Sequence, residues 1–211
     1  MKGIFITFEG TEGSGKTTII NNIEKELKEK GFKVIKTREP GGSNISEEIR
    51  NIILNVENVE MDKITEALLY AASRRQHVIE VIKPHLEKGY IVLCDRYVDS
   101  SLAYQGYARG IGIEKVYQLN QFAIEGLLPD LTLYIDVKPE IGLKRISNNH
   151  RDQDRLDLEA LSFHELVYNG YAEVVKKFPE RIKVIPGNTD IEKVNTMVTK
   201  EIYNHLELYN V

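Results

Sequence analysis

The sequence contains a single cysteine, no long apolar segment and no excess of basic residues. Because Cys94 is alone among 211 residues, neither an internal disulfide nor a cysteine-based metal cluster can form. No apolar run approaches the roughly 20 residues that a membrane-spanning helix needs. Lys and Arg number 28 against 32 Asp and Glu, a net charge of −4 at pH 7, whereas nucleic-acid-binding domains usually carry a basic excess. These absences argue against a disulfide scaffold, a membrane protein and a nucleic-acid-binding protein.

The composition is that of a folded globular domain. Hydrophobic residues make up 42% and charged residues 28%, close to globular averages. The length suffices for one sizeable core and falls short of two ordinary domains. An acidic residue, Glu9, occurs before a signal-peptide apolar region could develop. We therefore expect one cytoplasmic domain over residues 1–211.

Short apolar segments alternate with longer amphipathic ones, a pattern typical of an α/β fold with a parallel sheet. Strands are predicted at Ile4–Phe8, Lys33–Thr37, Ile91–Asp95, Leu131–Asp136 and Ile182–Ile185. Helices are predicted at Thr17–Lys30, Ser46–Asn55, Ile64–Lys88, Ile113–Leu127, Pro139–Ser147, Leu158–Phe178 and Ile191–Tyr209. In the long helix the predicted buried positions are Leu68, Leu69, Ala72, Val78, Ile82 and Leu86. Because the strands are continuously apolar, helices should cover both faces of the sheet.

Residues 10–17 match the phosphate-loop pattern G-x-x-x-x-G-K-[ST], between a predicted strand and a predicted helix. Glycines let backbone N–H groups surround phosphate oxygens, and the following helix adds the positive end of its dipole. Lys16 would bridge the β- and γ-phosphates, and the Thr17 hydroxyl would join a Mg²⁺ ion. The predicted ATP-binding residues of this segment are Gly10, Thr11, Glu12, Gly13, Ser14, Gly15, Lys16, Thr17 and Thr18.

A phosphate loop alone does not specify the reaction. The sequence lacks the Asn-Lys-x-Asp string by which GTPases recognise guanine. Asp95 ends a predicted strand, but Arg96 follows it in place of the second acid of ATPase motors. Both absences favour phosphoryl transfer to a small acceptor.

Five motifs in order resemble those of thymidylate kinase, and the resemblance extends from Ile4 to about Tyr171. They are Thr7-Phe8-Glu9-Gly10 with its phosphate loop, Arg38-Glu39-Pro40-Gly41-Gly42, Ala71-Ala72-Ser73-Arg74-Arg75, Asp95-Arg96-Tyr97, and Ser100-Ser101-Leu102-Ala103-Tyr104-Gln105-Gly106. The resemblance is greatest to enzymes of Gram-positive bacteria. It implies an α/β fold of the P-loop NTP hydrolase type, similar to nucleoside monophosphate kinases, with a five-stranded parallel sheet covered on both faces. It also implies a homodimer that phosphorylates dTMP to dTDP with ATP and Mg²⁺.

The resemblance assigns the chemistry at the end of the third predicted strand. Arg96 would contact the acceptor phosphate, where a guanidinium offsets the repulsion between two approaching anions. Asp95 would hold the Mg²⁺ shell or a water and orient Arg96. Arg38 and Arg50 are expected near the acceptor phosphate. Glu39 is expected at the sugar, at a metal-bound water or at Arg96, and the sequence leaves these three open.

The resemblance also assigns recognition of the thymidylate. Tyr70 and Arg74 are four residues apart, hence on one helix face, where Tyr70 can stack on the pyrimidine and Arg74 can donate to a base carbonyl. Ser101 and Gln105 have the same spacing, and Gln105 offers a donor and an acceptor to the base. Tyr104 resembles the tyrosine that packs under the deoxyribose. Tyr171, by contrast, is expected to serve in packing.

The polar segment of about residues 145–157 is expected to form a lid. One branch of the family carries an arginine inside the phosphate loop, where this chain has Glu12 and small residues. The resemblance is therefore to the bacterial branch, and it assigns Arg151 and Arg155 to the transition state, closing over the γ-phosphate. Arg145 would cover the adenine.

Three other interpretations remain possible at this stage. A different nucleoside monophosphate or deoxynucleoside kinase would share the phosphate loop, although a purine would need a larger and differently paired base site. A nucleotide-dependent switch has no acceptor phosphate to hold, so Asp95 and Arg96 argue against it. A degenerate kinase that survives as a binding protein is the third alternative.

Overall fold

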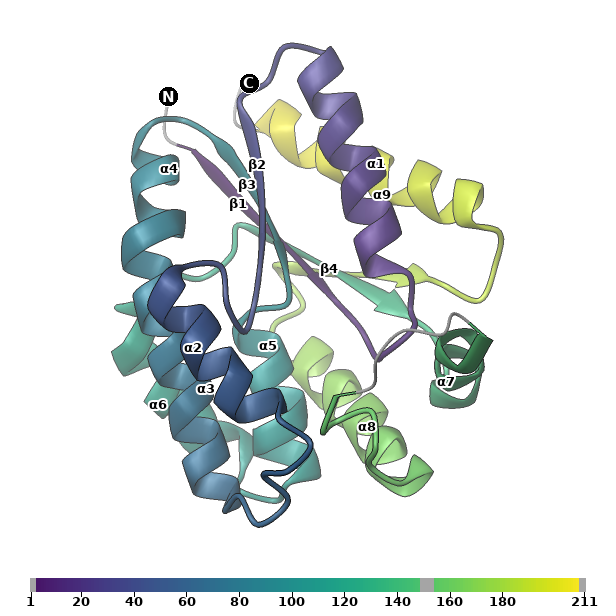
Figure 1. Ribbon diagram of the computed structural model, residues 1–211. Coiled ribbons are helices and arrows are strands. Elements are labelled where there is room, and N and C mark those ends of the chain that lie inside the picture. The colour runs from purple at the N-terminus through teal and green to yellow at the C-terminus, as the bar shows by residue number, and fades with distance from the viewer. Residues whose placement is uncertain (1–2, 149–153, 209–211) are drawn as a thin grey trace.

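The computed structural model describes residues 3–148 and 154–208 and contains the predicted parallel sheet (Figure 1). Its strands lie in the order β2-β3-β1-β4-β5, and every neighbouring pair is parallel. Their bounds are β1 Ile4–Glu9, β2 Val34–Arg38, β3 Ile91–Asp95, β4 Leu131–Asp136 and β5 Ile182–Pro186. All five predicted strands are confirmed to within one residue at each end.

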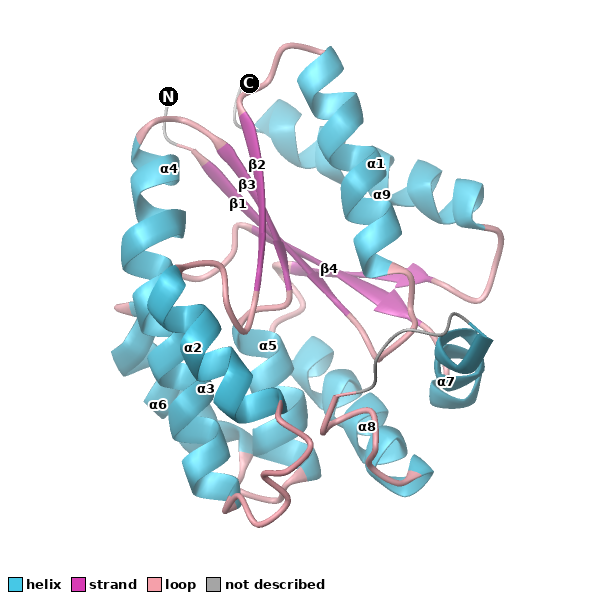
Figure 2. Cartoon of the chain, viewed as in Figure 1, coloured by secondary structure: helices cyan, strands magenta, loops and turns pink. Residues whose placement is uncertain are grey.

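Helices cover both faces of this sheet (Figure 2). One face carries α1 (Lys16–Glu29) and α9 (Ile191–Leu208), which contact each other. Helix α7 (Pro139–Asn148) lies beside the phosphate loop. The other face carries α2 Asn44–Leu54, α3 Lys63–His77, α4 Lys83–Glu87, α5 Val98–Ser101, α6 Ile113–Ile124, α8 Leu161–Lys177 and two π-helical segments, η1 Val78–Ile82 and η2 Leu102–Ala108. In the described ranges, no helix is long and apolar enough to cross a membrane.

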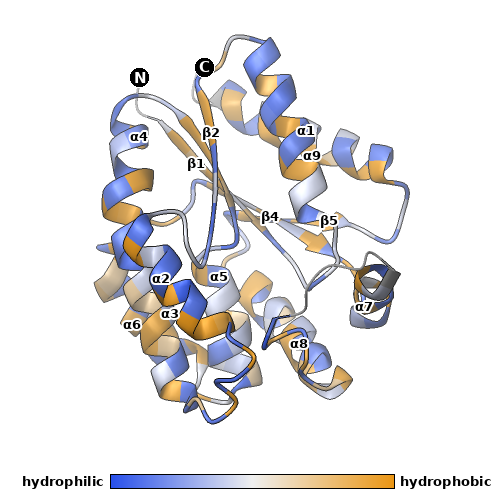
Figure 3. Cartoon of the chain, in the orientation of Figure 1, coloured by the Kyte–Doolittle hydropathy of each residue, from blue (hydrophilic) through white to orange (hydrophobic). Residues whose placement is uncertain are grey.

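The core has two halves because successive side chains of each strand point to opposite faces. Ile4 and Ile6 of β1 pack with α1 and α9, whereas Phe5 packs with the helices of the other face. The central strands are apolar along most of their length (Figure 3). Burial on both faces explains why these strands lack polar–apolar alternation.

The parallel arrangement brings the carboxyl ends of β1 and β3 to one edge. Phe8 pairs in register with Asp95, so the phosphate loop that follows β1 lies beside the Asp95–Arg96 pair. At Arg96 the backbone takes φ 68°, a left-handed conformation that is rare for a side-chain-bearing residue, while its N–H donates to the Phe8 carbonyl at 2.9 Å. Ligands of open α/β sheets collect at this edge.

The long predicted helix Ile64–Lys88 is present as the succession α3–η1–α4, but part of its predicted buried face is wrong. Leu68 is 51% exposed and Ala72 is also exposed. The helix instead buries the face that carries Tyr70, Arg74 and His77. Polar side chains occupy this face because it borders the cleft described below. A search for apolar positions at helical spacing cannot find a buried face of this kind. The predicted list of helices also omits the helical residues 98–108, and the predicted burial of Val78, Ile82 and Leu86 is confirmed.

A close approach between α7 and the phosphate loop gives a test of this packing. A Cβ atom at Gly142 would overlap the backbone carbonyl of Glu12, which has no flexible end that could move aside. We expect Gly142→Ala to lower the free energy of unfolding by about 1–3 kcal/mol, as overpacking does. We also expect it to weaken triphosphate binding, and calorimetry and a binding titration would measure the two effects. Ser147→Ala, an exposed position of the same helix, is the control; equal behaviour of the two variants would contradict the close contact.

Candidate active site

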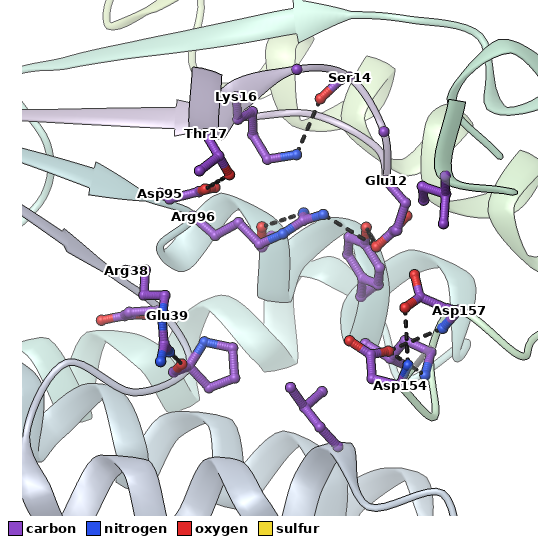
Figure 4. Close-up of a pocket in the computed structure, with 18 of the residues that line it drawn as sticks. Glu12, Ser14, Lys16, Thr17, Arg38, Glu39, Asp95, Arg96, Asp154 and Asp157 are labelled. Carbon is purple, nitrogen blue, oxygen red and sulfur yellow. Dashed lines mark hydrogen bonds and ion pairs between the residues drawn. The ribbon is translucent and has the colours of Figure 1, made fainter. Parts of the chain in front are cut away.

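A cleft of about 870 Å³ opens at the carboxyl edge of the sheet (Figure 4). Its size is typical of ligand-binding pockets. The phosphate loop forms its middle, and two groups of residues extend from that loop in different directions. One group is Arg145, Ile146, Gly187, Thr189, Ile191 and Val194; the other is Arg38, Glu39, Pro40, Arg50, Leu54, Tyr70, Arg74, Ser101, Tyr104 and Gln105. We call these the α9 side and the α3 side of the cleft.

The phosphate loop is held by its own lysine. The Lys16 ammonium donates to the carbonyls of Gly10 and Thr11 at 3.0 Å and to the Ser14 hydroxyl at 3.1 Å. Burial, assisted by Arg96, lowers the pKa of Lys16 to about 8. Among the predicted ATP-binding residues, Glu12 to Thr18 line the cleft. Thr11 points elsewhere and donates its hydroxyl to the Val137 carbonyl, which anchors the loop to the end of β4.

Thr17 and Asp95, the two residues predicted to bind Mg²⁺, lie together. The Thr17 hydroxyl, in the first turn of α1, donates to an Asp95 carboxylate oxygen at 3.1 Å, and both residues line the cleft (Figure 4). The described residues contain no group of three or more His, Cys, Asp or Glu side chains able to hold a metal ion. One hydroxyl and one carboxylate nevertheless suit Mg²⁺, which is usually bound by one or two protein oxygens together with phosphates and waters.

Arg96 lies at the middle of the cleft and forms an ion pair with the phosphate loop. Its guanidinium donates to Glu12 Oε1 at 3.1 Å and lies 5.2 Å from the centre of the Tyr104 ring. The Tyr104 hydroxyl donates to the same Glu12 oxygen, and His164 of α8 lies 3.5 Å from the other one. Burial opposes ionisation of Glu12, but the adjacent Arg96, His164, Tyr104 and Lys16 outweigh it and hold the pKa of Glu12 well below its usual range. The sequence predicted Glu12 only as a phosphate-loop residue, whereas its carboxylate reaches the α3 side.

Two arginines converge on one backbone carbonyl at the α3 side. Arg38 at the end of β2 and Arg50 of α2 each donate to the Pro40 carbonyl at 2.8 Å. Glu47 neutralises part of this charge by a 3.0 Å ion pair with Arg38. Burial and the neighbouring Arg38 lower the pKa of Arg50. Two guanidinium groups this close together make a site that favours an anion.

Arg74 is almost fully buried and tightly held. It donates to Glu39 at 2.6 Å, to the Ser101 hydroxyl at 2.9 Å, to the Tyr97 carbonyl at 3.0 Å and to Asn120. These bonds use four of the five N–H groups of a guanidinium. Glu39 accepts from Arg74 and makes its other contact with His77 at 2.9 Å. The Glu39 carboxylate therefore fixes Arg74 within the cleft, and its predicted contact with the sugar or with a metal-bound water stays a prediction.

Four of the predicted thymidylate-binding residues, Tyr70, Ser101, Tyr104 and Gln105, line the α3 side. The Gln105 amide donates to Glu66 at 2.8 Å, which leaves its carbonyl oxygen and second N–H for other partners. Glu66 is a buried carboxylate of α3 that the sequence analysis missed. A glutamate one helical turn before Tyr70 was the available signal.

Arg155 does not lie at the phosphate loop in this structure. Its guanidinium donates to Glu66 at 2.5 Å and to the Ile53 carbonyl at 2.8 Å, and its backbone N–H donates to Leu54. The buried Glu66 carboxylate requires positive partners, and Arg109 supplies a second one at 3.2 Å. The other predicted lid arginine, Arg151, lies outside the described residues.

Arg145, the predicted adenine-covering residue, lies at the α9 side. Its guanidinium reaches the carbonyls of Gly13 and Gly187, both at 3.4 Å. The sequence analysis missed residues 187–194, which complete this side. Their position in the sequence could have indicated them, because they follow the last strand at the edge where ligands of parallel sheets collect.

Comparison with known proteins identifies the family. A family model described as thymidylate kinase matches residues 8–198. Curated thymidylate kinases of Clostridium novyi and Bacillus licheniformis are 61% and 54% identical, over 92% and 98% of this chain and 95% and 96% of those proteins. The chain belongs to the thymidylate kinase family. A crystal structure of thymidylate kinase from Ehrlichia chaffeensis, 34% identical, superposes with a TM-score of 0.79 and covers 96% of this chain and 100% of that one.

Arg155 was predicted to act at the γ-phosphate, but in the structure it pairs with Glu66, and the kinetics of dTMP phosphorylation can distinguish the two roles. We expect Arg155→Met to lower the free energy of unfolding by about 3 kcal/mol, because one partner of a buried ion pair is lost. Through Glu66 and Gln105 it should raise the KM for dTMP while kcat changes less than about threefold. Arg109→Met, which removes the other cation at Glu66, should behave alike. A loss of about 10³ in kcat for Arg155→Met alone would instead support direct contact with the γ-phosphate. Steady-state kinetics and thermal unfolding provide these measurements.

Proposed function

We propose that the cleft binds ATP on its α9 side and dTMP on its α3 side and transfers the γ-phosphoryl group to give ADP and dTDP, a step in dTTP synthesis. The observation that carries the proposal is the continuity of the cleft. A triphosphate-binding loop, a guanidinium in the middle and an anion site lined by an aromatic and an amide occur in one cavity. This is the arrangement that direct transfer between two bound nucleotides requires, since proximity and orientation supply much of the catalysis.

The proposed transfer depends on charge at the midpoint of the cleft. Lys16 and the loop N–H groups hold the β- and γ-phosphates of ATP. Arg38 and Arg50 attract the dTMP phosphate, and Arg96 lies between the two anions and offsets their repulsion as they approach. Thr17 and Asp95 would hold Mg²⁺ with the ATP phosphates. The ion would neutralise negative charge on these phosphates.

Base selection is assigned to the α3 side. Tyr70 offers an aromatic face for stacking on the pyrimidine. Arg74 has one N–H left for a base carbonyl, and Gln105 has a donor and an acceptor for the polar edge of thymine. Ser101 supports this set through Arg74, and Tyr104 lies under the proposed sugar position, next to Glu12. Arg145 would cover the adenine, while Arg151 retains the role of lid cation over the γ-phosphate. We assign the reaction to the cytoplasm.

The specificity of the reaction can be tested with five acceptors. ADP release from MgATP would be measured with dTMP, dUMP, dCMP, dGMP and dAMP offered separately. We expect a strong preference for dTMP and at least about 10³-fold lower kcat/KM for the purine nucleotides, because they leave buried polar groups unpaired. Preference for another monophosphate would overturn the base site and keep the chemistry. No acceptor-dependent turnover in the presence of bound ATP would overturn the proposed function.

The same proposal includes a homodimer, and exposed apolar side chains of α3, η1 and α6 support it. Leu68 and Ile79 are exposed on one long helix, and Phe122 of neighbouring α6 is 87% exposed. The two elements are fastened together by Arg75, which donates to the Ala123 carbonyl. Exposed apolar side chains mark an interaction surface where they form one contiguous patch, and their place on adjacent helices favours such a patch here.

We expect Phe122→Asp to convert a dimer to a monomer at micromolar concentration, because burial of the introduced carboxylate would be unfavourable. Sedimentation velocity would measure the mass. Val59→Asp provides the control, since Val59 is 76% exposed in the loop before α3. A monomeric unmodified chain, or a dimer that persists in Phe122→Asp, would contradict this interface.

A further inference from the structure

Two hydroxyl groups accept hydrogen bonds from the Arg96 guanidinium. One Arg96 nitrogen donates to Tyr171 Oη at 3.0 Å and to Ser100 Oγ at 3.2 Å. Tyr171 comes from α8 and Ser100 from α5, so the guanidinium is held by elements other than the strand that Arg96 follows. A guanidinium has only donors, and each hydroxyl must therefore accept from it and direct its own proton elsewhere.

Both hydroxyl protons are directed at the same buried carboxylate. Tyr171 Oη donates to Glu9 Oε2 at 2.8 Å, and Ser100 Oγ donates to the same oxygen at 2.6 Å. The other oxygen of Glu9 accepts from the backbone N–H of Tyr97 at 2.8 Å and from that of Ser100 at 3.3 Å. An ionised carboxylate only accepts, so Glu9 fixes the direction of the whole chain of hydrogen bonds.

Glu9 and Tyr171 are both buried and closely packed. Glu9 is fully buried as the last residue of β1, directly before the phosphate loop. The Tyr171 ring is stacked on Tyr134 with centroids 5.0 Å apart and meets the edge of Tyr104 at 6.2 Å. The position of the Tyr171 hydroxyl is thus set by core packing before any substrate binds, which is how a site is preorganised.

We propose that Tyr171, acting with Glu9, is a positioning residue that fixes the Arg96 guanidinium for the acceptor phosphate. The proposal rests on the role assigned to Arg96 under the proposed function. Tyr171 is not a catalytic residue, since it acts through Arg96. Its hydroxyl and not its ring carries the role, because the ring packs against Tyr134 while the hydroxyl holds Arg96.

The protonation of Glu9 gives the arrangement a pH dependence. Burial and the nearby Asp99 raise the pKa of Glu9 to about 7, while Arg96, Ser100 and Tyr171 act to lower it. Below this pH a protonated Glu9 becomes a donor and reverses one of the hydrogen bonds that direct the hydroxyls toward Arg96. Activity should therefore decline as the pH falls through about 7. The titratable and charged groups that face Glu9 are Lys16, Cys94, Arg96, Asp99, Tyr171 and Arg181.

The test compares Tyr171→Phe with Tyr134→Phe. Each variant removes one hydroxyl from the same aromatic stack, but within residues 3–148 and 154–208 only that of Tyr171 bonds to Arg96. Loss of a hydrogen bond to a charged group predicts a fall of roughly 10- to 100-fold in kcat/KM for dTMP in Tyr171→Phe. The KM for ATP should change less than about threefold. Tyr134→Phe should retain the activity of the unmodified chain.

The pH profile of kcat/KM for dTMP supplies a readout that a purely structural role would not change. Tyr171→Phe removes a hydrogen bond that lowers the pKa of Glu9, so the acidic limb should move to higher pH. The phosphate of dTMP also titrates near pH 6, but it does so equally with Tyr171→Phe and with Tyr134→Phe. The test is therefore the difference between the pH profiles of these two variants. Ser100→Ala, which removes the second hydroxyl, should move the limb in the same direction.

Two outcomes would overturn the inference. The first is equal kcat/KM and equal pH profiles for Tyr171→Phe and Tyr134→Phe at comparable melting temperature. The second is an equal loss of affinity for ATP and for dTMP in Tyr171→Phe. Arg96→Ala separates this inference from the proposed function. If Arg96→Ala keeps normal turnover, the role of Arg96 fails; if it is inactive while Tyr171→Phe matches its control, only the positioning role fails.

Discussion

The ion pair between Arg96 and Glu12 joins the two halves of the cleft, and much of the site is arranged around it. Arg96 follows β3 and Glu12 lies in the loop after β1, so the pairing of these two parallel strands brings the charges within 3.1 Å. The left-handed backbone at Arg96 turns its side chain from the sheet edge into the cleft, at an expense of order 1 kcal/mol. Packing of the surrounding helices must offset that strain. Fold and site are thus coupled at one residue.

On the α3 side, too, ion pairs within the protein hold the charged side chains of the cleft in place. Arg74 is fixed by Glu39, which His77 holds in turn, and Glu66 is fixed by Arg109 and Arg155. A buried charge without a partner is strongly unfavourable, so each group is paired within the protein. The guanidinium and amide groups are therefore oriented before a nucleotide arrives. Such preorganised dipoles need little rearrangement during the reaction, which is where most electrostatic catalysis arises.

The sequence predicted what depends on local patterns and missed what depends on tertiary partners. Apolar runs located all five strands, the glycine pattern located the phosphate loop, and four-residue spacing placed Tyr70 and Arg74 on one face of the cleft. Leu68 was predicted to be buried, yet the polar face of α3 is the buried one because it meets other charged side chains. The position of Arg155 depends on Glu66, 89 residues away, and no local pattern indicates such a pairing.

Tyr171 shows why packing and function are hard to separate from a sequence. Tyr171 was expected to serve in packing, and its ring does pack, against Tyr134 and Tyr104. Its hydroxyl reaches past that contact to a carboxylate 162 positions earlier in the chain and to Arg96. Because the ring is closely packed in the core, the hydroxyl is held more rigidly than that of a surface side chain would be. Rigid packing is in this way the means by which a distant helix contributes to the geometry of the phosphate site.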